Sequence, residues 1–179
     1  YQRLRPMQVA CSPVCALELA RKAAAKKQAK AVAQDRKESK AKLDAMRTKP
    51  KLTKLAQAAF NAFIRARDAG KPCISCGNPL PAERMGGAFD CGHYRSVGSA
   101  PHMRFVEDNA NGQCKHCNRH LAGNHVAYRM GLVSRIGQKA VERIEADTVT
   151  RKYTHEGLIA LAKQYREMTK QILKERNGP

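Results

Sequence analysis

The chain has 179 residues, with 34 Lys or Arg against 15 Asp or Glu, and its net charge of +19 predicts a polyanionic partner, most commonly nucleic acid. The length fits one domain with an appendage rather than two full domains, and no apolar run approaches the ~18 residues of a membrane-spanning helix. Aromatic residues make up only 5% of the chain, so we expect a small core that a bound metal helps to hold together.

The first segment, residues 1–15, contains two cysteines in a knuckle-like spacing, Cys11-Ser-Pro-Val-Cys15. Two thiolates are half of the ligand set of a tetrahedral Zn²⁺ ion. Because the sequence does not begin with Met, we expect the native chain to start earlier and to supply another cysteine pair that completes a second zinc site. In the alternative, the two thiols bind nothing and lie in the first turn of a helix.

A basic helical arm is predicted for residues 16–70. Its first part, residues 16–54, carries 13 Lys or Arg, 4 Asp or Glu and no aromatic residue, which is typical of a solvated helix rather than a coiled coil. Pro50 is expected to end this helix. A second helix follows and ends at Gly70. Its predicted apolar stripe comprises Leu55, Ala59, Ala62, Phe63 and Ala66.

Residues 71–137 differ in character, because Gly, Pro, Asn, Cys and His replace the Ala and Lys of the arm. Loops, short strands and a metal site are therefore expected in this segment. A helix around Leu121 to Leu132 should follow, and Gly137 should interrupt it.

The C-terminal extension, residues 138–179, is predicted to be helical. A short helix is expected around Val141, and a final helix is expected after Thr154. The final helix has a regular apolar face from Leu158 to Ile172. We expect this face to cover the core or to form the surface of a homodimer.

Two CxxC pairs, Cys73 with Cys76 and Cys114 with Cys117, are separated by 37 residues. Each pair offers two thiolates, and together they match the four-coordinate preference of a structural Zn²⁺ ion. Buried or redox-active thiols are the alternative. Because no export signal begins the sequence, we expect reduced metal ligands in the cytosol rather than disulfides. Cys91, between the pairs, is expected to pack rather than to bind metal.

Zinc at these cysteines would close the intervening segment into a loop with an unusual set of polar residues. A zinc knuckle built only for stability needs none of them. Hydrolysis of a phosphodiester needs a base for water, a divalent cation and a group that orients the base, so the set indicates nuclease chemistry. Its members are Asp90, His93, His102, Glu107, Asp108 and Asn109, with Asn118 directly after the last cysteine.

The run DCGHYRSVGSAPHMRF, followed by EDNANGQCKHCNRHLAGN, resembles the signature of the HNH or ββα-metal endonucleases, and within them the phage recombination endonucleases called NinG or Rap. The resemblance covers residues 73–137 closely and the flanking helices only in character. It implies a mainly α-helical protein around a small zinc-stapled ββα-metal core, with Mg²⁺ or Mn²⁺ as catalytic cofactor. It also implies a phage protein that acts in the cytoplasm of the bacterial host.

The resemblance implies a role for each polar residue. His93, on the first strand of a β-hairpin, would be the general base, and Asn109 would hold its imidazole in the working orientation. Asn118 would ligate the catalytic cation together with Asp90. Many HNH enzymes place the metal carboxylate directly before the base histidine, whereas Asp90 lies three residues before His93.

Simpler roles are open for the same residues. His93 could be a surface or packing residue, Asn109 favours turns, and Asn118 could cap a helix. The other histidines of the segment are candidate substitutes for the base. Of these, His102 and His120 are expected to contact phosphate, whereas His116 lies inside a knuckle and should point away.

Contacts to DNA are predicted on the arm and on the core. The arm could be only a solvated face, but its nine net positive charges in residues 16–54 should neutralise several phosphates without reading sequence. The predicted contacts are Arg21, Lys22, Lys26, Lys27, Lys30, Arg36 and Lys37 on the arm, and Arg95, His102, Arg104, Arg119 and His120 on the core.

The sequence therefore predicts a metal-dependent endonuclease that acts as a homodimer and cuts branched recombination intermediates, such as four-way (Holliday) junctions and D-loops. The main rival is a noncatalytic zinc-ribbon protein that binds DNA or RNA. A third candidate is a structural RNA-binding protein akin to the small basic ribosomal proteins. His93, Asn109 and Asn118 inside the zinc loop favour the nuclease.

Overall fold

The computed structural model describes residues 9–82 and 87–178, and the chain divides into two compact units between Arg47 and Thr48. The predicted arm, residues 16–70, therefore spans parts of both units. Residues 1–8 of the predicted first segment lie outside the described residues. Across the described ranges, no helix combines the length and the apolar character that a membrane span requires.

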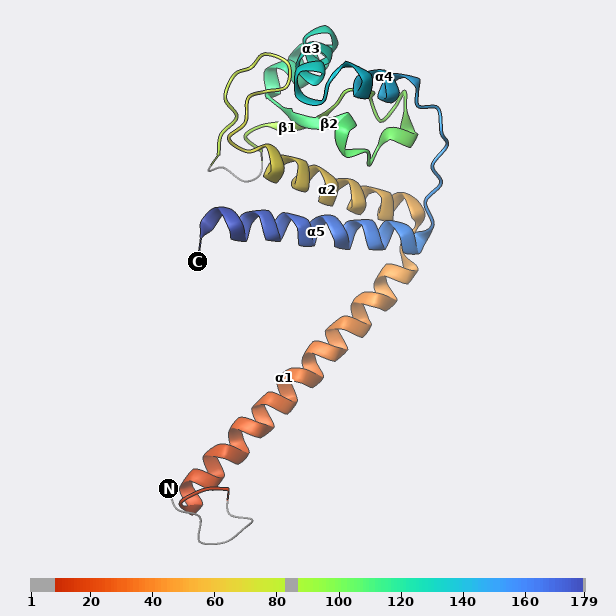
Figure 1. Ribbon diagram of the computed structural model, residues 1–179. Coiled ribbons are helices and arrows are strands. Elements are labelled where there is room, and N and C mark those ends of the chain that lie inside the picture. Colours follow the sequence, from red (N-terminus) through yellow and green to blue (C-terminus); the bar gives the residue numbers. More distant parts are fainter. Residues whose placement is uncertain (1–8, 83–86, 179) are drawn as a thin grey trace. The chain divides into compact units, whose positions relative to one another are not determined.

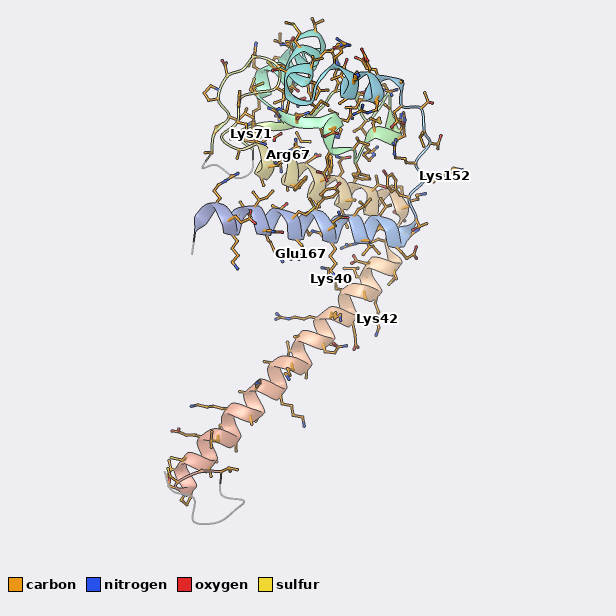
Figure 2. All side chains as sticks on the ribbon, in the orientation of Figure 1. Lys40, Lys42, Arg67, Lys71, Lys152 and Glu167 are labelled. Carbon is orange, nitrogen blue, oxygen red and sulfur yellow. The ribbon has the colours of Figure 1, made fainter. Side chains whose placement is uncertain are left out.

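The first unit consists mainly of one long helix, α1 (Pro13–Met46). Ser12 caps its start, because the Ser12 hydroxyl accepts a hydrogen bond from the backbone N–H of Cys15 over 3.2 Å. None of its 34 residues is buried, and Figure 2 shows Lys40 and Lys42 extending from the helix. This helix is the solvated basic helix that the composition predicts.

The prediction for Pro50 was wrong. The first helix ends at Met46, and Pro50 lies in the first turn of the next helix, α2 (Lys49–Asp68). A proline is tolerated there because the first turn of a helix does not use its backbone N–H groups in intrahelical bonds.

Helix α2 is the centre of the second unit, because it is covered from two sides. Figure 1 shows α5 (His155–Asn177) alongside it, and a hydrogen bond of 2.6 Å from Arg176 to the Ala66 carbonyl joins the two C-terminal ends. The predicted stripe describes only part of this packing, since Phe60 and Ile64 are also fully buried. A helix enclosed on two sides has no single apolar face.

The apolar face of α5 belongs to this core. Leu158, Ala162 and Tyr165 are buried with the apolar residues of α2, and Met168 and Ile172 pack at the edge of the same cluster. Thr154 caps the helix by accepting a hydrogen bond from the N–H of Gly157. The prediction of a homodimer surface on this face is therefore wrong, because the chain's own core occupies it.

A two-stranded antiparallel sheet packs on α2, formed by β1 (Asp90–His93) and β2 (Ala110–Gln113). The long connection between the strands contains two single turns of 3-10 helix, η1 (Pro101–Met103) and η2 (Glu107–Asn109). Gly112 of β2 is essential to this contact, because a Cβ at that position would lie 2.9 Å from the Cβ of Asp68.

The remaining helices cover the other side of the sheet. A short π-helical turn, η3 (His116–His120), follows β2 and leads to α3 (His125–Ile136) and α4 (Gln138–Ala146). Gly137, at a φ of 85°, separates the last two, as predicted. The second unit is thus layered in the order α5, α2, hairpin, and α3 with α4 (Figure 1).

Candidate functional site

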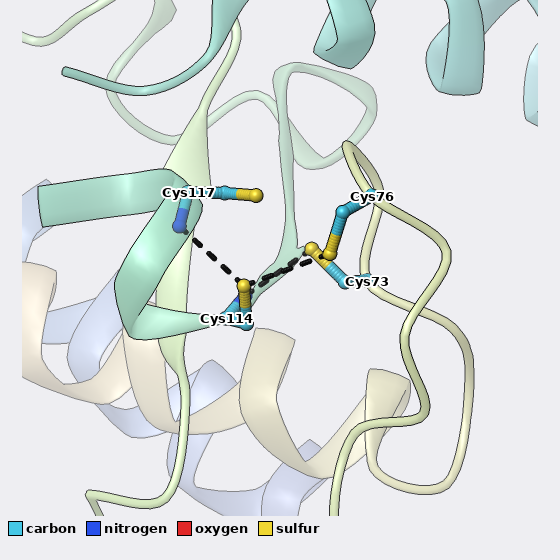
Figure 3. A group of neighbouring side chains, drawn as sticks. All are labelled: Cys73, Cys76, Cys114 and Cys117. Atoms are coloured by element: carbon cyan, nitrogen blue, oxygen red, sulfur yellow. Dashed lines mark hydrogen bonds between the residues drawn. The ribbon is translucent and has the colours of Figure 1, made fainter. Parts of the chain in front are cut away.

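The structure brings the four predicted cysteines together. The sulfur atoms of Cys73, Cys76, Cys114 and Cys117 all lie within 4.8 Å of one another (Figure 3), and those of Cys76 and Cys114 are 3.8 Å apart. Zn–S bonds of about 2.3 Å in a tetrahedron place neighbouring sulfurs about 3.8 Å apart. The cluster therefore fits a structural zinc ion, which these four thiolates would hold. Cys91 lies outside it and packs at the edge of the core.

The backbone of both knuckles is arranged around the sulfur atoms. Gly77, at a φ of 74°, turns the first knuckle so that its N–H donates to the Cys73 carbonyl over 3.0 Å. Burial opposes ionisation of the Cys73 thiol, but hydrogen bonds from the N–H groups of Cys76, Cys114 and Ser75 outweigh it and lower its pKa to about 7. The Cys73 thiol is therefore readily available as a thiolate. Burial raises the pKa of the Cys76 and Cys117 thiols, so a bound cation would have to stabilise their thiolate forms.

A buried carboxylate anchors this centre to α2. Asp68, the last residue of α2, is only 1% exposed and accepts hydrogen bonds from Arg67 (2.8 and 3.0 Å) and from the N–H of Gly112 (2.8 Å). Lys71 and Arg135 complete its set of cations, and Figure 2 shows Arg67 and Lys71 at this end of α2. One carboxylate thus joins α2, β2, the first knuckle and α3.

Sequence reasoning missed this network. Asp68 and Arg67 are adjacent, so their pairing leaves no periodic signal, and their other partners lie far along the chain. The one available sign was Asp68 itself, the single acidic residue of α2, at the end of that helix. Tyr128 extends the network, because its buried hydroxyl accepts from Asn111 over 3.2 Å and donates to the Gly92 carbonyl over 2.9 Å.

His93 ends β1, and its ring is held in one orientation. Its Nε2 lies 3.0 Å from the backbone carbonyl oxygen of Arg104, and the ring packs on Phe60 with centroids 5.9 Å apart. A carbonyl only accepts, so Nε2 carries the proton and Nδ1 of the neutral ring keeps its lone pair. Burial lowers the pKa of His93 below its ordinary value, so the ring is neutral at pH 7.

Asn109 contacts the loop after His93 rather than the imidazole. Its Oδ1 accepts from the N–H of Arg95 over 2.8 Å, and its Nδ2 donates to the carbonyls of Arg95 (3.0 Å) and Met103 (3.3 Å). The side chain is fully buried. Asn109 therefore fixes the connection that carries Arg104, whose carbonyl in turn holds the His93 ring.

The two residues predicted to bind the catalytic cation lie together. Asn118 donates from Nδ2 to Oδ2 of Asp90 over 3.0 Å, and Arg119 forms a bidentate ion pair with the same carboxylate at 2.7 and 2.8 Å. These hydrogen bonds, first of all those of Arg119, lower the pKa of Asp90. Asn118 lies inside η3, so it is not a helix cap. Among the described contacts, none joins Asp90 or Asn118 directly to His93.

Four predicted DNA contacts are engaged within the protein, one of them Arg119 through its ion pair with Asp90. Arg95 donates to the carbonyls of Ile144 and Asp147, and His102 contacts the same Asp147 carbonyl over 2.8 Å, so both close the C-terminal end of α4. Arg104 donates to Oε1 of Gln57 over 3.1 Å.

Other predicted contacts are exposed. His120 lies exposed on η3. His116, which was expected to point away rather than to contact DNA, is also exposed there, and the two ring centroids are 6.0 Å apart. In the first unit, Cys11 and Cys15 place their sulfurs 3.3 Å apart. The seven predicted cations of α1, namely Arg21, Lys22, Lys26, Lys27, Lys30, Arg36 and Lys37, are all exposed.

Fold and site define a mostly helical protein in which a four-cysteine centre suited to zinc fastens a β-hairpin to flanking helices. The family model described as "Bacteriophage Lambda NinG protein" matches residues 1–175. The chain belongs to this NinG family.

Individual relatives agree with this assignment. Protein ninG of Escherichia phage lambda is 44% identical over 124 residues, which are 69% of this chain and 58% of that protein. Protein ninG of Salmonella phage P22 is 44% identical over the same length, or 59% of that protein. The matched part thus spans less than two thirds of these relatives. No solved structure matches the chain.

Proposed function

We propose that this protein is a metal-dependent endonuclease that hydrolyses branched DNA, with His93 as the general base. The observation that carries the proposal is the fixed His93 ring, whose Nε2 is occupied by the Arg104 carbonyl and whose Nδ1 is left to accept a proton from water. A histidine that served only to pack would not need its orientation fixed through a second buried side chain, that of Asn109.

Asp90 and Asn118 are the proposed holders of the Mg²⁺ or Mn²⁺ ion. A carboxylate and an amide oxygen are ligand types that Mg²⁺ accepts, and rotation of the Asn118 amide would present its oxygen in place of its nitrogen. Arg119 pairs with the same carboxylate, so the ion would have to displace this guanidinium. When bound, the ion would polarise the phosphate and stabilise the leaving oxygen.

The preference for branched substrates rests on the charge of the first unit and on the family resemblance. Helix α1 presents an unburied basic surface over 34 residues, which binds phosphates without reading base sequence. A partner recognised by shape, such as a four-way junction, suits that kind of contact better than a defined sequence does.

The test is single-turnover cleavage of a synthetic four-way junction and of a linear duplex of equal length. We expect Mg²⁺-dependent nicking of the junction that His93→Ala removes while junction affinity stays within a few-fold. A noncatalytic zinc-ribbon protein, the rival, would bind both DNAs and cut neither. Cleavage retained by His93→Ala would move the base to another histidine, with exposed His120 the first to test.

A further inference from the structure

A second basic feature lies on α2, and of the residues assigned so far it includes only Arg104. A groove of about 650 Å³ runs along the first half of the helix. Its lining side chains recur every three or four residues, so they share one face of α2, and Arg104 from the hairpin connection closes the groove. The polar lining residues are Lys49, Thr53, Lys54, Gln57, Asn61 and Arg104.

The chemistry of the groove matches a phosphodiester backbone. Three cations line it and no carboxylate does, while Thr53, Gln57 and Asn61 add neutral groups of the kind that contact phosphate and sugar oxygens. The Arg104 guanidinium is already held by Gln57 over 3.1 Å, so binding would cost little of its side-chain freedom.

The groove is also connected to the proposed base. Arg104 lines the groove with its side chain and holds Nε2 of His93 with its backbone carbonyl. Phe60, which packs on the His93 ring, is one helical turn from Gln57. The charge of Arg104 is close enough to help lower the pKa of His93. A strand that lies in the groove therefore contacts the residue whose backbone carbonyl holds the imidazole.

We propose that this groove binds the sugar–phosphate backbone of the cleaved strand on one side of the scissile bond, with Lys49, Lys54 and Arg104 contacting successive phosphates. This inference rests on the proposed nuclease function, and it names the part of the substrate that the site takes. It also assigns to Arg104 the task of positioning the strand and the base together.

The test measures the affinity of a fluorescent four-way junction for the full chain as a function of salt, without divalent cation and in a His93→Ala background. Lys49→Gln with Lys54→Gln should make the slope of log affinity against log salt shallower by about 1.8, at about 0.9 per lost phosphate contact. Arg104→Gln should remove about 0.9 more, because the groove charge is lost while the backbone carbonyl remains.

The matched control is Lys163→Gln with Lys174→Gln, two exposed lysines of α5, the layer farthest from the sheet. It changes the net charge equally and should leave the slope unchanged. Equal zinc content and equal circular dichroism would show that all variants are folded. An unchanged slope in the groove variant, or an equal change in the control, would overturn the groove assignment. Because no cleavage enters the measurement, a parent protein that never cuts DNA would overturn the nuclease and leave the groove result standing.

Discussion

The amide of Asn118 donates a hydrogen bond to the carboxylate of Asp90 over 3.0 Å, and this contact joins the first strand of the hairpin to the turn after the second zinc knuckle. The two residues are 28 positions apart in the chain, and the closure of the four-cysteine centre brings them together. The same carboxylate is paired with Arg119, so a cation that binds there must compete with a guanidinium.

This competition predicts opposite effects of two neighbouring substitutions. Asn118→Ala removes an oxygen ligand and should raise the Mn²⁺ concentration needed for half-saturation by about tenfold or more. Arg119→Gln removes the competing charge and should lower it. Mn²⁺ binding to the full chain without DNA, followed by electron paramagnetic resonance, measures both. Equal Mn²⁺ affinity in both variants and the parent would show that Asp90 and Asn118 do not bind the catalytic ion.

Loss of one zinc ligand should unfold the hairpin region. Cys114→Ser leaves three thiolates, and the centre would then lack the ligand that adjoins β2. We expect loss of about one zinc ion per chain and a large fall in thermal stability of the second unit, because zinc binding contributes folding free energy directly. Cys91→Ser is the control, since Cys91 lies outside the cluster. Unchanged zinc content in Cys114→Ser would contradict the assignment.

Asp68→Asn should destabilise the second unit by about 3 kcal/mol, because it leaves half-buried Arg67 without its carboxylate. Burial opposes the ionisation of Asp68, but Arg67 and the Gly112 N–H outweigh it and lower its pKa. A lowered pKa in the folded state gives stability that is present above the unfolded value, about 3.9, and is lost as the pH falls through the folded value. Urea unfolding from pH 3 to 7 should show a weaker acid dependence in Asp68→Asn. An equally steep dependence would place the acid-sensitive group elsewhere.

The lowered pKa of His93 predicts how stability and cleavage depend on pH. Burial lowers this pKa below the ordinary value of about 6.5, so the unfolded chain binds the proton more readily than the folded chain does. The contribution of His93 to folding stability therefore rises with pH until the pH passes about 6.5. Cleavage that needs the neutral ring should therefore decline only below about pH 6.5. Single-turnover nicking rates between pH 5 and 8 measure this limb. A decline that begins above pH 7 would mean that another group acts as the base.

Much of this arrangement could be predicted from the sequence, because its signals are local. The CxxC spacing predicted the cysteine cluster, and Gly137 and Thr154 predicted helix ends, since each depends on neighbouring residues. Pairings between distant segments leave no such signal. The Asp68 network and the burial of Phe60 depend on which elements enclose α2. The apolar periodicity of α5 is the same in sequence whether the chain's own core or a partner covers that face.

Removal of α1 tests the role of the basic arm, and the structure shows where to cut. The unit boundary precedes Thr48, whereas buried Leu52 belongs to the core, so the truncated chain should comprise residues 48–179. We expect it to keep the zinc centre, to bind junction DNA with a salt slope shallower by several units, and to lose much of its preference for junctions over duplex. Unchanged slope and preference would make α1 only a solvated helix.

The most direct test of the whole account is Mg²⁺-dependent nicking of a four-way junction by the parent chain and by His93→Ala, with junction affinity and zinc content measured on the same samples. The account predicts that the parent nicks the junction, that His93→Ala does not, and that affinity and zinc are retained. A parent chain that binds the junction with zinc in place but does not cut it with any divalent cation, or a His93→Ala chain that cuts as fast as the parent, would contradict the account.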